Sequence, residues 1–295
     1  MHALFKPLWR IYLILLWSWL LIVLVQILFI AGELNGFFST GVSNVSFGST
    51  LIRISLISFF VWLTVFVIGA IILTSISFQK VNKLTEETLR KCDVTSFINT
   101  YDDYHKQIEQ YPKRFAQTTK ITIVINRING YLNIGDYATA KLILDELSKI
   151  NIKKSEKLLA LFQNLNWSIY YLGIKDLEQA RIRLEIASNL LEENPQLKTK
   201  YADFYLPVKL SFKVATNDFE GVEEELLSLL KNAKNLLGKV SIHYTLGQFY
   251  FHKKRFIEAL NMFDFVTTHG GDTHFVQTAE IYLNQTMANN EMNIT

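Results

Sequence analysis

The sequence predicts an all-α protein that has two transmembrane helices followed by an α-solenoid of about four helix pairs plus a capping helix. Two long uncharged apolar runs, 11–31 and 54–77, predict the transmembrane helices. After residue 79, apolar residues recur at spacings of three and four, the period of helices that bury one face. Turn residues recur between these stretches, so we expect the helical part to consist of successive pairs.

The first apolar run is long enough to cross a bilayer. Its 21 residues would rise about 32 Å as a helix, close to the hydrocarbon thickness of a membrane. The run also exceeds the apolar core of a cleaved signal peptide, which is about 7–15 residues long. We therefore expect 1–79 to form a transmembrane hairpin with an outer loop at 32–50, and the lipid bilayer to be one partner of the chain.

Charges that flank the hairpin predict its orientation. Lys6 and Arg10 precede the first run and Lys80 and Lys83 follow the second, whereas the loop 32–50 holds no Lys or Arg. Arg53 argues against this orientation, but a single charge at a helix end can reach the interface. Basic residues favour the cytoplasmic side of a membrane. The sequence thus predicts a multi-pass protein of the cell membrane, with its N-terminus and its C-terminal domain in the cytoplasm.

The clearest internal repeat lies near the C-terminus, at residues 243–266. Its sequence, HYTLGQFYFHKKRFIEALNMFDFV, carries six positions in a recognisable order: Leu246, Gly247, Tyr250, Phe256, Ala259 and Phe263. This order resembles the tetratricopeptide repeat (TPR), except that His243 stands where the first aromatic residue is usual. The resemblance implies helix pairs that stack into a solenoid, because no single pair can bury its own apolar face.

Weaker copies precede this repeat and share one small or branched residue with it. The equivalent positions are Ala140, Ala180, Val222 and Ala259, which are 40, 42 and 37 residues apart. A small side chain there lets the two helices of a pair cross closely. We expect TPR-like repeats over 115–295, ending in a capping helix at 272–288, and a juxtamembrane helical linker or eroded repeat at 80–114.

The composition argues against several functions. The 30 basic and 27 acidic residues nearly cancel, so nucleic acid is not an expected partner. Cys92 is the only cysteine, which excludes an intrachain disulfide. The chain carries no phosphate-binding glycine loop, no nucleophile elbow and no zinc-protease motif. We therefore predict that the protein is not an enzyme and uses no cofactor.

Two polar clusters have alternative interpretations. His269, Asp272 and His274 could ligate a metal, but the two glycines between them favour a turn between helices. The basic tract 252–255 could contact anionic lipid, but it also falls where the last repeat should turn. We interpret both clusters as turns and predict no metal site.

Asparagine is the most informative polar residue of the repeats. Asn126, Asn129 and Asn133 recur on the first helix of one repeat and Asn166 lies on the first helix of the next, and Gln248 lies on the first helix of the last repeat. An amide can donate to and accept from a peptide backbone at once. This arrangement resembles the helical-repeat sensors of peptide pheromones in Gram-positive bacteria, although the helix-turn-helix domain of those sensors has no counterpart here. The resemblance implies a peptide-binding groove formed by these five residues.

The sequence therefore predicts a membrane-tethered adaptor of bacterial origin that presents a helical-repeat groove to a protein or peptide in the cytoplasm. The alternative is a membrane effector or immunity protein. In that case the hairpin would oligomerise or contact a membrane target, through Gln26 and the small pair Gly69-Ala70, and the repeats would sense a signal. An enzyme with a dispersed active site is the third hypothesis.

Overall fold

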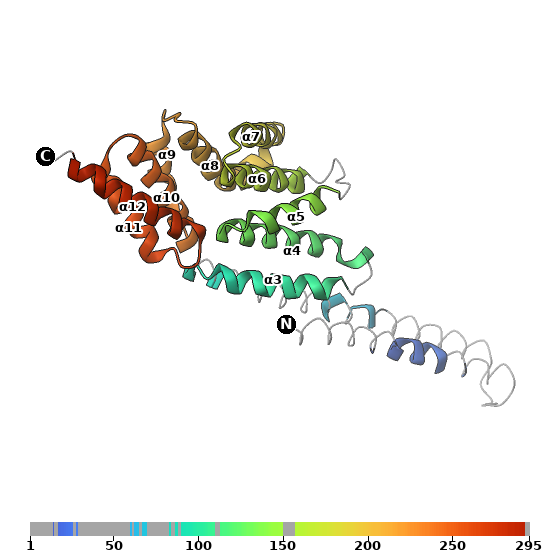
Figure 1. The fold of residues 1–295 in the computed structure, drawn as a ribbon. Helices are drawn as coiled ribbons and strands as arrows, with labels where there is room; N and C mark the ends of the chain where they lie inside the picture. Colours follow the sequence, from blue (N-terminus) through green and yellow to red (C-terminus); the bar gives the residue numbers. More distant parts are fainter. Residues whose placement is uncertain are drawn as a thin grey trace, which may run out of the picture. The chain divides into compact units, whose positions relative to one another are not determined.

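The structure is a computed structural model that describes part of the chain, and every regular element in that part is an α-helix (Figure 1). The described residues are 14, 17–25, 28, 60, 62–64, 67–69, 83, 86–87, 90–109, 113–149 and 157–292. The chain forms two compact units, Met1–Lys83 and Leu84–Thr295.

The membrane part of the predicted fold class requires correction. Among the described residues, no helix is both long enough and apolar enough to cross a membrane. The predicted loop 32–50 and parts of the predicted spans 11–31 and 54–77 lie outside the described residues. An uncharged run indicates apolar surroundings but does not specify the length of unbroken helix, so the two-helix hairpin and the functions built on it are not carried further.

The second unit is a series of helices in which each packs against the next. In chain order they are α3 (Val94–Ile108), α4 (Lys113–Ile134), α5 (Tyr137–Ser148), α6 (Lys157–Gly173), α7 (Leu177–Glu192), α8 (Pro195–Ala215), α9 (Val222–Asn232), α10 (Leu236–His252), α11 (Phe256–His269) and α12 (His274–Met292). The region predicted as a linker at 80–114 thus contains α3, and the expected capping helix at 272–288 corresponds to α12.

One tight turn recurs between the helices of successive pairs. A residue with positive φ ends the first helix, and the next backbone N–H donates to the carbonyl five residues earlier at 2.9 Å. The positive-φ residues are Gly135, Lys175, Asn217 and Lys254. This is the Schellman end of a helix, which satisfies carbonyls that the helix itself leaves free. The turns are spaced by 40, 42 and 37 residues, as are the small residues of the repeats, so the second unit is built of repeated helix pairs.

The small residues of the repeats lie five positions after these turns, at the start of each second helix. Ala140, Ala180, Val222 and Ala259 are all fully buried. In the last pair the close approach is also visible at Gly247, where an added Cβ would lie 2.6 Å from the Phe263 ring. Small residues on one helix therefore make room for large side chains on the other.

Replacing Ala259 with tryptophan should overpack the last helix pair. Forcing extra volume into a well-packed core costs about 1–3 kcal/mol or more. We expect the melting temperature of Ala259→Trp to fall by several degrees, at about 2–4 °C per kcal/mol for a domain of this size. Ile257→Trp is the matched control, because Ile257 lies two residues earlier on α11 and is 65% exposed. Equal melting temperatures for the two variants would contradict the packing described here.

The first helices of the pairs form a closed ring. Contacts join α4 to α6, α6 to α8, α8 to α10 and α10 to α12, and α12 also contacts α4. Each second helix, α5, α7, α9 and α11, packs against the two first helices that flank it. Figure 1 shows the result near the start of the unit, where the red α11–α12 loop lies beside the beginning of α3. The last repeat thus returns to the first helices of the unit.

Candidate functional site

The asparagines of α4 lie on one side of that helix. Asn126, Asn129 and Asn133 are three and four residues apart, so they share a face. Arg127 pairs with Asp102 of α3, and Asn129 is two residues further on, about 200° around the helix and so turned away from α3. All three are partly exposed, and Asn133 Nδ2 donates to the backbone oxygen of Asn129 at 2.7 Å. The side chains of Asn126 and Asn129 make no hydrogen bond to another described residue, so their amides, unlike that of Asn133, have no partner within this part of the chain.

Asn166 is the least satisfied polar side chain of the predicted set. The Ser168 hydroxyl donates to the Ala180 oxygen of α7 at 3.2 Å, and Asn166 is two residues earlier, so it points away from α7. Asn166 is only 3% exposed, yet no described residue accepts a hydrogen bond from its Nδ2. A buried donor without an acceptor costs about 1–3 kcal/mol. A buried polar atom without a partner is rare in folded proteins and is often explained by a bound water, ion or ligand.

Gln248 is engaged within the fold. Its Nε2 donates to the Tyr244 hydroxyl at 3.0 Å and to the Tyr282 hydroxyl at 3.4 Å. Tyr244 and Gln248 lie on α10 and Tyr282 lies on α12, so this amide joins two neighbouring first helices. Burial raises the pKa of Tyr244, which keeps its hydroxyl protonated in this contact. The structure thus places Gln248 in an internal network, apart from the four asparagines.

An aromatic cluster next to Asn166 was missed by the sequence analysis. Phe162 of α6 contacts Tyr201 and Phe204 of α8, with ring centroids 5.6 Å apart in both pairs. Phe204 remains 56% exposed. Phe162 precedes Asn166 by one helical turn, so the rings and the buried amide are neighbours. The signal that could have found the cluster is the pair Tyr201 and Phe204 at helical spacing.

These side chains belong to the side of the ring that the second helices leave open. Phe204 contacts α6, whereas Ser211, seven residues on along the same face of α8, hydrogen-bonds Thr245 of α10 at 3.2 Å. That face of α8 therefore turns toward its neighbouring first helices. We call the set Asn126, Asn129, Phe162, Asn166 and Phe204 the inner face. It combines amides with exposed aromatic carbon and carries no ionised group.

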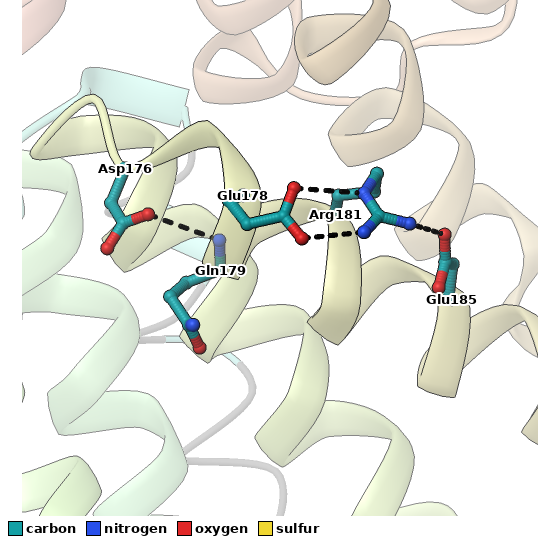
Figure 2. A network of polar contacts seen from close by, with 5 residues as sticks. All are labelled: Asp176, Glu178, Gln179, Arg181 and Glu185. Carbon is teal, nitrogen blue, oxygen red and sulfur yellow. Dashed lines mark hydrogen bonds and ion pairs between the residues drawn. The ribbon is translucent and has the colours of Figure 1, made fainter.

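The outer helices present the opposite chemistry. Figure 2 shows α7, where the Arg181 guanidinium pairs with Glu178 and Glu185, each at 2.6 Å. Asp176 caps the same helix by accepting from the Gln179 backbone N–H at 3.2 Å. These charges are solvated and already paired with one another, so they contribute little to stability and leave little unsatisfied charge for a partner.

The segment between His269 and His274 forms a turn, as the sequence predicted. Within the described residues, no group of His, Cys, Asp and Glu is arranged to hold a metal. Both carboxylate oxygens of Asp272 accept hydrogen bonds from backbone N–H groups of α3. Burial lowers the pKa of the His274 imidazole to about 4. Cys92 is fully buried, and burial followed by the nearby Asp272 charge raises the pKa of its thiol to about 11. A protonated, enclosed thiol is a poor nucleophile.

The basic tract at 252–255 is also a turn. Lys254 has a φ of 59°, and the Arg255 guanidinium is held by Glu223 at 2.8 Å and by Glu258 at 2.9 Å. The positive charge of Arg255 is thus paired within the protein.

The fold and the inner face define an all-helical protein built of repeated helix pairs. Comparisons with models of protein families, with curated proteins and with solved structures found no match.

Proposed function

We propose that the second unit is a non-enzymatic, TPR-like module that binds an extended peptide segment of a partner protein on the inner face. The observation that carries this proposal is the buried Asn166 amide, whose Nδ2 has no acceptor and which lies one helical turn from Phe162, the contact of the exposed Phe204 ring. An extended peptide offers backbone groups that pair with amides and side chains that pack on aromatic rings. Aromatic anchors beside a desolvated polar group are typical of binding hot spots.

The inner face also indicates what kind of peptide it would bind. None of its five side chains is charged, so we expect the contacts to be made by the peptide backbone and by apolar or aromatic side chains. Asn126 and Asn129 on α4 extend the row of amides beyond Asn166. A peptide that spans α4, α6 and α8 would therefore meet amides along one line and the aromatic cluster at its end.

Substitutions on the inner face should weaken binding without weakening the fold. Peptides would be selected against the full chain from a random library displayed on phage, and their Kd values measured by fluorescence anisotropy. We expect Asn166→Ala and Phe204→Ala each to raise Kd about tenfold or more, equivalent to about 1.4 kcal/mol. The melting temperature of Asn166→Ala should stay equal or rise, because the variant removes an unpartnered buried donor.

Matched controls lie on the outer helices. Asn189→Ala on α7 and Ile257→Ala on α11 change exposed side chains of the same kinds and should leave Kd unchanged. If the selected peptides bind Asn166→Ala and Phe204→Ala as tightly as they bind the parent protein, the inner face is not the binding site. Failure to enrich any peptide would contradict the proposed function as a whole.

A further inference from the structure

One contact between distant segments of the second unit differs from the contacts within the ring. Between successive pairs, the helices meet through continuous apolar clusters that join α4 to α6, α6 to α8 and α8 to α12. Where the last pair meets α3, the contact, which we call the joint, combines the buried Cys92 side chain with hydrogen bonds to a carboxylate. Asp272 Oδ1 accepts from the Val94 N–H and Oδ2 from the Thr95 N–H, both at 2.7 Å. The chain between these partners is almost the whole of the second unit.

Two aspartates share the N-terminus of α3. Asp93, which directly precedes the helix, accepts from the Ser96 N–H at 3.1 Å. Asp272, from the α11–α12 loop, satisfies the two N–H groups before it. The first N–H groups of a helix have no partner within the helix, and they carry the positive end of its dipole. Both carboxylates are therefore stabilised at the same place, but only Asp272 crosses the joint.

The backbone at the joint fits closely. The Asp272 N–H donates to the Cys92 oxygen at 3.3 Å, and an added Cβ on Gly271 would collide with that oxygen. Gly271 has a φ of 57°, which also favours glycine. A second contact lies at the start of α12, where an added Cβ on Gly135 would be 2.9 Å from the His274 Cβ. Gly271, Asp272 and Thr95 are nevertheless exposed, so the contact between the loop and α3 lies at the surface of the protein.

The accessibility of the Cys92 thiol would indicate whether this joint is open. The Cys92 side chain is fully buried and belongs to the apolar cluster of α8–α12, although the residue lies two positions before α3 in sequence. It is the only cysteine of the chain. Separation of α3 from the α11–α12 loop would uncover its thiol without requiring the helix pairs to unfold.

We propose that this joint opens locally, with Asp272 as a latch that holds the N-terminus of α3 against the α11–α12 loop. Release of the latch parts α3 from that loop and uncovers Cys92. That the opening also admits a peptide to the inner face rests on the function proposed above, whereas the opening itself does not. Local openings of this kind occur where a contact is polar and small, since the free energy of opening is then lower than that of global unfolding.

The test compares two variants of the full chain that each remove one cap from the same helix. Asp272→Ala removes the cap that crosses the joint, and Asp93→Ala removes the local cap. The rate at which a small thiol reagent modifies Cys92 under native conditions is expected to rise about tenfold or more in Asp272→Ala and far less in Asp93→Ala, at similar melting temperatures. Asp272→Asn should be intermediate, because its amide keeps one acceptor oxygen. Equal rates in Asp272→Ala and Asp93→Ala would overturn the latch.

Hydrogen exchange in the parent protein tests the same joint without substitution. The Val94 and Thr95 amides should exchange through an opening of lower free energy than the amides at the centre of α5. If they exchange only with global unfolding, the joint does not open and the proposal fails. Neither measurement involves a peptide, so failure of the latch proposal can be distinguished from failure of the proposed function.

Discussion

Replacing Phe263 with alanine is expected to lower the free energy of unfolding by about 3–5 kcal/mol, the largest loss predicted for this protein. Phe263 is fully buried on α11. Its ring stacks on Tyr282 of α12, with centroids 5.0 Å apart and planes 7° apart, and lies against Gly247 of α10. The side chain therefore joins three helices at once. Its loss leaves a cavity that none of the three can close without moving.

Urea denaturation of the full chain, monitored by circular dichroism, measures this loss. Phe204→Ala is the matched control, because Phe204 is mostly exposed and its removal should cost no more than about 1 kcal/mol. The two variants thus compare a fully buried phenylalanine with a mostly exposed one. If both variants unfold at the same urea concentration, the packing assigned to Phe263 is wrong.

Leu144→Ala is expected to cost about 2–5 kcal/mol, whereas Leu142→Ala should cost no more than about 0.5 kcal/mol. Both leucines lie on α5, so the change in helix propensity is the same in the two variants. Leu144 is fully buried in the cluster that joins α4, α5 and α6, whereas Leu142 is 67% exposed. The difference between the two variants therefore measures burial alone.

Thermal unfolding of both leucine variants gives that difference directly. We expect melting temperatures that differ by at least several degrees, at about 2–4 °C per kcal/mol. A difference near zero would mean that α5 does not pack on α4 and α6 as the structure shows.

Features that depend on short stretches of chain could be predicted from the sequence. Ala140, Ala180, Val222 and Ala259 could be aligned from the sequence, because the helical period and the requirement for small residues at close crossings act over short stretches of chain. The turn residues that precede them are local as well. Gly135 and Asn217 are the residue types that adopt positive φ most readily, so their role is visible without tertiary structure.

Contacts between distant residues could not be predicted in this way. Nothing local distinguishes Asp272 from a cap of its own helix, yet it binds α3. Gln248 carries the same amide group as Asn166, but two tyrosine hydroxyls accept its hydrogens and none is placed to accept those of Asn166. The aromatic cluster at Phe204 depends on how α6 and α8 are aligned. Each of these outcomes is decided by which helices become neighbours.

The sequence by itself determined that the C-terminal part is helical, that its pairs repeat at intervals of 37 to 42 residues, and which small residues lie at the crossings. It did not determine the membrane hairpin, because an uncharged run does not establish a continuous spanning helix. Only the tertiary structure decided that the ring closes through α12 and α4, that Asp272 binds α3, and that Asn166 rather than Gln248 keeps a free amide. The reason is that helical period and turn chemistry are local properties, whereas ring closure and hydrogen-bond partners depend on residues far apart in the chain.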